Sequence, residues 1–286
     1  MVAPHDIVPV ILAGGRVTGL KPLAGRNRIP PFLRLHAGGS FFQDTIKRTR
    51  LFSKPVVMCR EGALAQVQMQ LSEIGAQASA IISEPEQKGT AAAIALAAFH
   101  LKNQGKRMLV LPADQIIQDH VAFQREMMVC GDLADEGIVL VGSKPNYAEK
   151  GYGYIELTDE LGGGTYGVKA FHEQPGRALM RKSHSSPQVV WNTGIFISRP
   201  RFYLDALQCL QPDLYRSCQR AYYAAEVHGA VIYPQEDEFS KIGYASVDQA
   251  IFERHDGFSV YVSEMPWGDA GTWKRFIRLK LLSGRQ

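Results

Sequence analysis

The sequence has few cysteines, and none of them stands in a spacing typical of a metal site. The four cysteines among 286 residues form no CxxC or CxxH pair. They are typical of reduced thiols and argue against a zinc site or a disulfide-stabilised fold. Long apolar runs are also missing, as is the charged-then-apolar order of a signal peptide. We therefore expect a cytoplasmic protein without a membrane span or membrane partner.

The sequence also has no large excess of charge of either sign. The formal net charge is only +4, and the basic residues are dispersed rather than interleaved with aromatic side chains. This composition predicts no nucleic-acid partner, although it permits an anionic small-molecule ligand. The eight histidines show no HxxxH spacing, so none is assigned to a metal.

Short apolar runs alternate with helical patterns through the first half of the chain. The strand candidates are residues 7–13, 55–59, 79–82, 107–112 and 137–142, and the helix candidates are residues 41–52, 62–74, 90–102 and 121–136. This alternation predicts an α/β fold with a doubly wound, mainly parallel sheet. Ligands of such sheets collect at the carboxyl ends of the strands. After Gly151 the pattern changes to hairpin-like strands, with a turn expected at 161–167.

A glycine pair, Gly14-Gly15, follows the first predicted strand directly. Glycines at such a point let the backbone come close to a ligand. The loop that follows is unusual, because Val17 stands where a phosphate-binding loop favours another glycine. Pro30 and Pro31 then remove two backbone donors. The loop's basic residues are more often solvated charges than ligands, but they remain open as replacement cations; they are Arg16, Lys21, Arg26 and Arg28.

Eight short strings occur in an order that resembles a known family. They are "LAGG…T…L.PL", "EP…..TAAAIALAA", "LPAD", "GYGYIE", "F.E.P", "WNTGIF", "SVDQAI.E" and "W.DAGTW". Together they resemble the sugar nucleotidyltransferases, most of all those of the bacterial mannose-1-phosphate guanylyltransferase type. The resemblance implies a Rossmann-like nucleotidyltransferase fold: a mixed, mainly parallel central sheet with helices on both faces. It also implies a reaction that joins GTP to mannose 1-phosphate, giving GDP-mannose and pyrophosphate.

The resemblance sets further expectations for domains and ligands. We expect a single domain over 1–286, with a nucleotide-side half (1–150) and a sugar-side half (151–286), and no C-terminal β-helix or cupin domain. The implied ligands are a nucleotide sugar or sugar phosphate, with Mg²⁺ as cofactor. A homodimer, or pairing with an active relative, remains open.

The resemblance also carries over individual site residues. The nucleotide-binding positions are Leu12, Ala13, Gly14, Gly15, Glu84, Pro85 and Thr90. The sugar-binding positions are Gly153, Glu173 and Asn192, and the metal-holding aspartates are Asp114 and Asp269. Read without the family, Asp114 could cap a following helix, Glu173 could be a surface carboxylate, and Asn192 could be a buried structural amide that needs a partner.

Three positions at which the family places phosphate-facing cations hold other residues here. The family arginine falls on Gly19, and its two lysines fall on Pro30 and Gln174. Gly89 also replaces the asparagine that usually precedes Thr90. We predict a binding or regulatory protein with a nucleotide-sugar pocket and weak or lost pyrophosphorylase activity. The alternative is an active guanylyltransferase with a rebuilt phosphate loop. We expect the loop from Arg16 to Phe32 to be mobile or altered in path.

Overall fold

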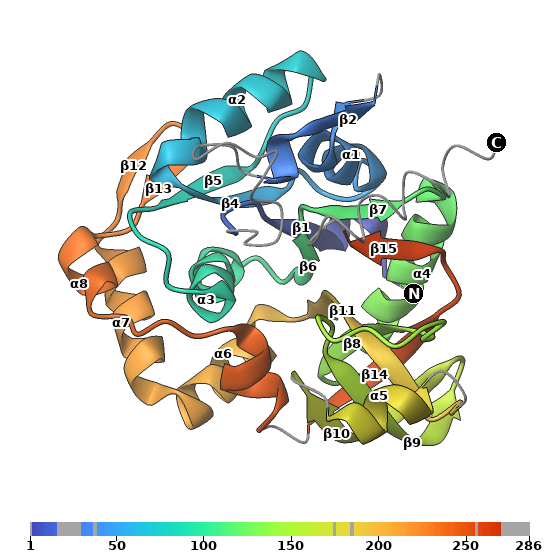
Figure 1. Ribbon diagram of the computed structural model, residues 1–286. Helices are drawn as coiled ribbons and strands as arrows, with labels where there is room; N and C mark the ends of the chain where they lie inside the picture. Colours follow the sequence, from blue (N-terminus) through green and yellow to red (C-terminus); the bar gives the residue numbers. More distant parts are fainter. Residues whose placement is uncertain are drawn as a thin grey trace.

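One large sheet runs through the computed structural model, which describes residues 2–15, 30–36, 39–173, 176–183, 186–254 and 257–269 (Figure 1). The sheet has 11 strands in the order β12-β13-β5-β4-β1-β6-β11-β8-β14-β10-β9. The strands are β1 (Ile7–Leu12), β4 (Val56–Arg60), β5 (Ala80–Glu84), β6 (Arg107–Pro112), β8 (Ile138–Ser143), β9 (Tyr154–Gly162), β10 (Thr165–His172), β11 (Val189–Ser198), β12 (Glu226–His228), β13 (Val231–Tyr233) and β14 (Phe258–Ser263).

The strands from β13 to β6 run parallel to one another. Their residues are almost continuously apolar and buried, which is the pattern of strands covered on both faces. The parallel arrangement brings the carboxyl ends of β1, β4, β5 and β6 to one edge. The sheet thus confirms the mainly parallel α/β fold expected from the alternating pattern.

The second part of the sheet is mixed. β11 is antiparallel to β6, β8 and β9, whereas β14 is parallel to β8. β9 and β10 form a hairpin whose turn glycines, Gly162 to Gly164, all have positive φ. The turn expected at this place is therefore confirmed.

Helices cover both faces of the sheet. Because alternate strand residues point to opposite faces, β1 contributes Val8 and Val10 to a core shared with α3, α6 and α7. Its Ile7 and Ile11 pack instead in a core shared with α1, α2 and α4. The bounds are α1 (Phe41–Arg48), α2 (Leu64–Glu73), α3 (Thr90–Leu101), α4 (His120–Leu133), α6 (Pro200–Leu210) and α7 (Pro212–Tyr223).

The remaining elements are short. They are α5 (Arg177–Ser183), α8 (Glu236–Ser240), β2 (Arg34–His36), β3 (Gly39–Ser40), β7 (Gln115–Ile117), β15 (Trp267–Asp269), η1 (Pro4–Asp6), η2 (Pro30–Phe32), η3 (Glu61–Ala63) and the π-helical turn η4 (Asp248–Phe252). Among the residues described, no helix has both the length and the apolar character needed to cross a membrane.

Candidate functional site

The predicted glycine pair lies at the carboxyl edge of the parallel strands. Gly14 follows β1, and a Cβ atom added there would lie 3.5 Å from Oε2 of Glu84 and 3.5 Å from the backbone nitrogen of Arg60. Arg60 and Glu84 end β4 and β5, and they are register partners. We call Gly14, Arg60 and Glu84 the Gly14 edge. Arg60 is a residue that sequence reasoning missed; its only signal is a cation directly after a predicted buried strand.

Glu84 is a buried carboxyl group. Burial raises the pKa of Glu84 to about 8, and the positive charge of Arg60 opposes this rise only partly. Glu84 therefore holds its proton through much of the neutral range, and it leaves the charge of Arg60 largely uncompensated. The Nε atom of Arg60 is buried and has no hydrogen-bond partner among the described residues.

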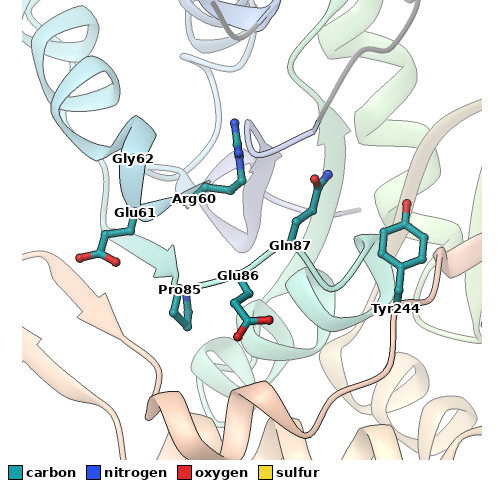
Figure 2. Close-up of a pocket in the computed structure, with 7 residues that line it drawn as sticks. All are labelled: Arg60, Glu61, Gly62, Pro85, Glu86, Gln87 and Tyr244. Atoms are coloured by element: carbon teal, nitrogen blue, oxygen red, sulfur yellow. The ribbon is translucent and has the colours of Figure 1, made fainter. Parts of the chain in front are cut away.

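A pocket of about 500 Å³ opens beside the Gly14 edge, between the ends of β4 and β5 and the segment that contains Tyr244. Figure 2 shows its lining residues: Arg60, Glu61, Gly62, Pro85, Glu86, Gln87 and Tyr244. The side chains of Arg60, Gln87 and Tyr244 point in a common direction, whereas Glu61 and Glu86 point elsewhere (Figure 2). Its volume lies within the range of about 300 to 1,000 Å³ found for small-molecule sites.

Thr90 and Gly89 serve a local packing role in this chain. The hydroxyl of Thr90, at the start of α3, accepts a hydrogen bond of 2.9 Å from the backbone nitrogen of Val247. Gly89 has a φ of 90°, and a side chain there would collide with the carbonyl group of Ala245. The family asparagine therefore cannot occupy position 89 without movement of the 244–247 segment.

The predicted sugar-side residues lie close together on the opposite half of the sheet. A Cβ atom added at Gly153 would lie 3.2 Å from Oε2 of Glu173 and 3.3 Å from Cβ of Asn192. The backbone nitrogen of Asn192 also donates to the carbonyl oxygen of Gly153 over 2.8 Å. The structure thus brings together three residues from separate parts of the sequence.

Two further carboxylates join these residues. Nδ2 of Asn192 donates to Oδ1 of Asp248 over 2.9 Å, and the backbone nitrogen of Gly194 donates to Oδ1 of Asn192 over 3.1 Å. The backbone nitrogen of Glu173 donates to Oε1 of Glu253 over 3.1 Å. The partner expected for the Asn192 amide is therefore present. Asp248 and Glu253 were missed as site residues, although both lie in the string "SVDQAIFE".

We call Glu173, Asn192, Asp248 and Glu253 the acidic cluster. Burial, with the charges of Asp248 and Glu253, raises the pKa of Glu173 to about 8. Burial also raises the pKa of Asp248 to about 6, although the hydrogen bond from Asn192 opposes the rise. The cluster consequently binds a proton at neutral pH, because its carboxylates cannot all ionise cheaply at short range.

The two predicted metal-holding aspartates belong to adjacent segments. Asp114 lies between β6 and β7, and Asp269 is the register partner of Gln115 in the β7–β15 pair. The backbone positions of the two aspartates are therefore close. The helix-cap alternative for Asp114 is wrong, because Asp119 caps α4 by accepting from the backbone nitrogen of Ala122 over 2.9 Å.

A buried cation, Arg48, lies near Asp114. Its Nη1 donates to the carbonyl oxygen of Gln115 over 3.0 Å. Burial lowers the pKa of Arg48 to about 10, while the negative charges of Asp44 and Asp114 act in the opposite direction. Among the described side chains, no group of three or more histidine, cysteine, aspartate or glutamate residues is arranged to hold a metal ion.

Two of the three replaced cation positions, Gly19 and Gln174, lie outside the described residues, as does Val17. Pro30 begins the short turn η2. The expected mobility of the Arg16–Phe32 loop stays a prediction, as do the roles of the nucleotide-binding, sugar-binding and metal-holding residues.

Comparison with known proteins defines the class. The model of the nucleotidyl transferase family matches residues 8–283, and the chain belongs to this family. Within it, the chain is similar to the mannose-1-phosphate guanylyltransferase RfbM of Salmonella typhimurium, at 35% identity over 94% of this chain and 57% of the relative. It is also similar to the mannose-1-phosphate guanylyltransferase of Escherichia coli, at 36% identity over 93% of this chain and 58% of the relative. The chain thus spans less than two thirds of the length of either curated relative.

The fold also matches solved structures. A crystal structure described as the mannose-1-phosphate geranyltransferase of Thermus thermophilus superposes with a TM-score of 0.83, at 24% identity, over 99% of this chain and 80% of that one. This likeness confirms the Rossmann-like nucleotidyltransferase fold.

Proposed function

We propose that the chain binds a nucleotide sugar such as GDP-mannose at the carboxyl edge of its sheet, and that its pyrophosphorylase activity is weak or lost. A binding or regulatory role follows from such a pocket. The single observation that carries the proposal is the acidic cluster, in which Asn192 and Glu173 are held beside Gly153 by hydrogen bonds to Asp248 and Glu253.

The acidic cluster supports sugar binding for a chemical reason. Asn192 uses one N–H on Asp248 and one acceptor lone pair on Gly194; its second N–H and second lone pair have no hydrogen-bond partner among the described residues, so they can meet hydroxyl groups of a sugar. A side chain held in this way loses little conformational freedom when a ligand binds. Gly153 lets a sugar ring approach the backbone between Glu173 and Asn192.

The proposed loss of activity rests on the sequence. Transfer of a nucleotidyl group is catalysed mainly by positioning and by cations directed at the phosphate oxygens. Gly19, Pro30 and Gln174 carry no positive charge at the three positions where the family places one. Each lost electrostatic contact of this kind commonly lowers the rate about 10²- to 10³-fold.

Asp114 and Asp269 fit a magnesium ion. Carboxylate oxygens are the ligands that Mg²⁺ prefers, and one or two protein carboxylates suffice when water and phosphate complete the shell. The β7–β15 pairing of Gln115 with Asp269 is the observation that favours both aspartates as holders of the ion. When bound, Mg²⁺ neutralises charge on the phosphates.

The second candidate is an active guanylyltransferase that makes GDP-mannose from GTP and mannose 1-phosphate with a rebuilt phosphate loop. The observation that favours it is the similarity to curated guanylyltransferases over nearly the whole chain. In both candidates the ligands are a nucleotide sugar or a sugar phosphate.

Pyrophosphate release separates the two candidates. The purified chain is incubated with GTP, Mg²⁺ and mannose 1-phosphate, and pyrophosphate is followed by a coupled assay beside an active relative such as the Escherichia coli enzyme. We expect a rate at least about 10³-fold below that of the relative. A rate within about tenfold of the relative would establish the second candidate instead.

A further inference from the structure

Strand β11 contains a bulge directly after Asn192 of the acidic cluster. Asn192 and Phe196 pair with positions 142 and 140 of β8, so three residues of β11 face one residue of β8. A bulge leaves backbone groups without partners in the ladder of the sheet. Thr193 lies in this bulge and is only 4% exposed, so its carbonyl oxygen needs a donor from another part of the chain.

Gln115 supplies that donor. Its Nε2 donates to the carbonyl oxygen of Thr193 over 2.5 Å, and the residue is 3% exposed. Gln115 belongs to β7, so the bond joins segments that are 78 residues apart in the sequence. Loss of the donor would leave a buried carbonyl group unsatisfied, which costs more free energy than an ordinary hydrogen bond contributes. The bond therefore constrains the position of the bulge.

The bulge in turn orients the Asn192 amide. The backbone nitrogen of Gly194, which belongs to the peptide group of the Thr193 carbonyl, donates to Oδ1 of Asn192 over 3.1 Å. Gly194 has a φ of 72°, and a Cβ atom there would lie 3.3 Å from Cγ of Pro112, so the bulge packs closely against the end of β6. Displacement of this peptide group would move the donor that holds the Asn192 amide.

Gln115 is also tied to the predicted metal-holding residues. It follows Asp114 directly and is the register partner of Asp269. Its own carbonyl oxygen accepts a hydrogen bond of 3.0 Å from Nη1 of the buried Arg48. These contacts anchor Gln115 to β15 and to α1, so its side chain can hold the bulge at a fixed distance from the two aspartates.

We propose that Gln115 is a positioning residue that fixes Asn192 relative to the Asp114 segment, so that one ligand can occupy the sugar and phosphate parts of the site together. This proposal rests on the proposed function, because it names what aligns the same site. Gln115 acts through the Thr193 carbonyl group and not by touching the ligand. Binding groups must be held to within about 0.5 Å, so loss of this bond should be felt at the sugar.

The test is calorimetric titration of the full chain with GDP-mannose and with GDP, each with Mg²⁺ present. We call the ratio of the two affinities the sugar factor. Gln115→Met keeps most of the side-chain volume but has no donor, so it should lower the sugar factor about 3- to 10-fold while GDP binds as before. Gln115→Ala leaves room for a water molecule at the carbonyl group, and it tests the same loss if Gln115→Met does not fold. Gln115→His retains an N–H donor and should keep more of the sugar factor than either variant.

Two further variants separate positioning from a general loss of structure. In an Asn192→Ala background, Gln115→Met should lower the sugar factor no further, because Gln115 acts through Asn192. Gln43→Met is the matched control, since this buried glutamine also donates to a backbone carbonyl group, that of Gln70 over 3.1 Å, but between α1 and α2. It should lower the thermal unfolding temperature and leave the sugar factor unchanged.

The outcomes separate this proposal from the proposed function. If the wild-type chain binds GDP-mannose and Gln115→Met leaves the sugar factor unchanged, or weakens GDP equally, positioning by Gln115 alone is wrong. Effects of Gln115→Met and Asn192→Ala that simply add would overturn it as well, as would a Gln115→His variant that behaves like Gln115→Met. If the wild-type chain binds no GDP-mannose, the proposed function fails, and this proposal fails with it.

Discussion

At the Gly14 edge, one buried carboxyl group lies beside one guanidinium, and both come from neighbouring parallel strands. In the acidic cluster, three carboxyl groups surround one amide, and they come from segments widely separated in the sequence. The edge keeps the positive charge of Arg60 largely uncompensated, because Glu84 holds its proton through much of the neutral range, and few hydrogen bonds among the described residues orient its side chains. The cluster carries an excess of negative charge, yet hydrogen bonds hold its amide and its backbone in place.

This difference predicts which part of a ligand the Gly14 edge binds and which part the acidic cluster binds. A site with a free guanidinium favours acceptors and anions, so it suits the nucleotide. A site whose carboxyl groups share protons favours neutral donors such as sugar hydroxyls and disfavours phosphate. Because Gly19, Pro30 and Gln174 carry no positive charge at the family's cation positions, triphosphate recognition is predicted to be the weak part of the chain and sugar recognition the preserved part.

The largest effect is expected from restoring the missing charges. The combined variant Val17→Gly, Gly19→Arg, Pro30→Lys and Gln174→Lys should raise pyrophosphate release by about 10²-fold or more, because such contacts act on charge that develops in the transition state. The single changes should do little, since groups that act together are not additive. A folded quadruple variant that binds GDP-mannose and shows no gain would mean that something other than these cations is missing.

A second variant tests the close packing of Gly89 against Ala245, at a position where the family pattern has asparagine. Gly89→Ala should lower the free energy of unfolding by about 2 to 4 kcal/mol, because φ is 90° there and the added methyl group meets the Ala245 carbonyl. Chemical denaturation followed by circular dichroism measures the loss. Gly62→Ala is the control, since a Cβ at position 62 would meet nothing within 4 Å. Equal stability of the two variants would contradict the account.

The strands of the first half of the chain and their mainly parallel sheet could be predicted from the sequence, because apolar runs and glycines are local signals, whereas the order of the strands in the sheet could not. The acidic cluster could be predicted only in part. Glu173 and Asn192 came from the family resemblance, but Asp248 and Glu253 reach them through contacts across 56 and 80 residues of sequence. Arg60 could not be identified because a lone cation after a strand is ordinary, and only its neighbours Gly14 and Glu84 distinguish it.

Removal of the Asn192 amide should affect the sugar and spare the nucleotide. Asn192→Ala should weaken GDP-mannose about tenfold, the value of one or two hydrogen bonds, while GDP binds as before. Parallel titrations with both ligands measure the split. An equal loss for GDP and GDP-mannose would show that Asn192 acts on the fold or on the nucleotide, not on the sugar.

The smallest effect concerns the protons of the acidic cluster. The pKa of Glu173 rises from 4.5 to about 8 on folding, so the folded chain binds a proton that the unfolded chain has released. Stability from this group is full at low pH and is lost as pH rises from 4.5 toward 8. Glu173→Gln should therefore leave stability unchanged near pH ~4.

Near pH ~8 the same variant should be more stable than the wild-type chain by about 1 to 2 kcal/mol, a value that allows for solvent screening of a partly exposed group. Thermal unfolding across this pH window measures it. Glu61→Gln, at an exposed site, is the control. A stability gain that is equal at both pH values would contradict the proton-sharing account.

The central claim is that the chain recognises the sugar better than the terminal phosphates. Its most direct test is a pair of titrations of the wild-type chain with Mg²⁺ present, one with GDP-mannose and one with GTP. Both ligands carry guanine, so the comparison isolates the sugar from the terminal phosphate. The account predicts that GDP-mannose binds at least about tenfold more tightly, because the acidic cluster contacts the sugar while the phosphate-facing cations are missing. Tight binding of GTP with no binding of GDP-mannose would contradict it.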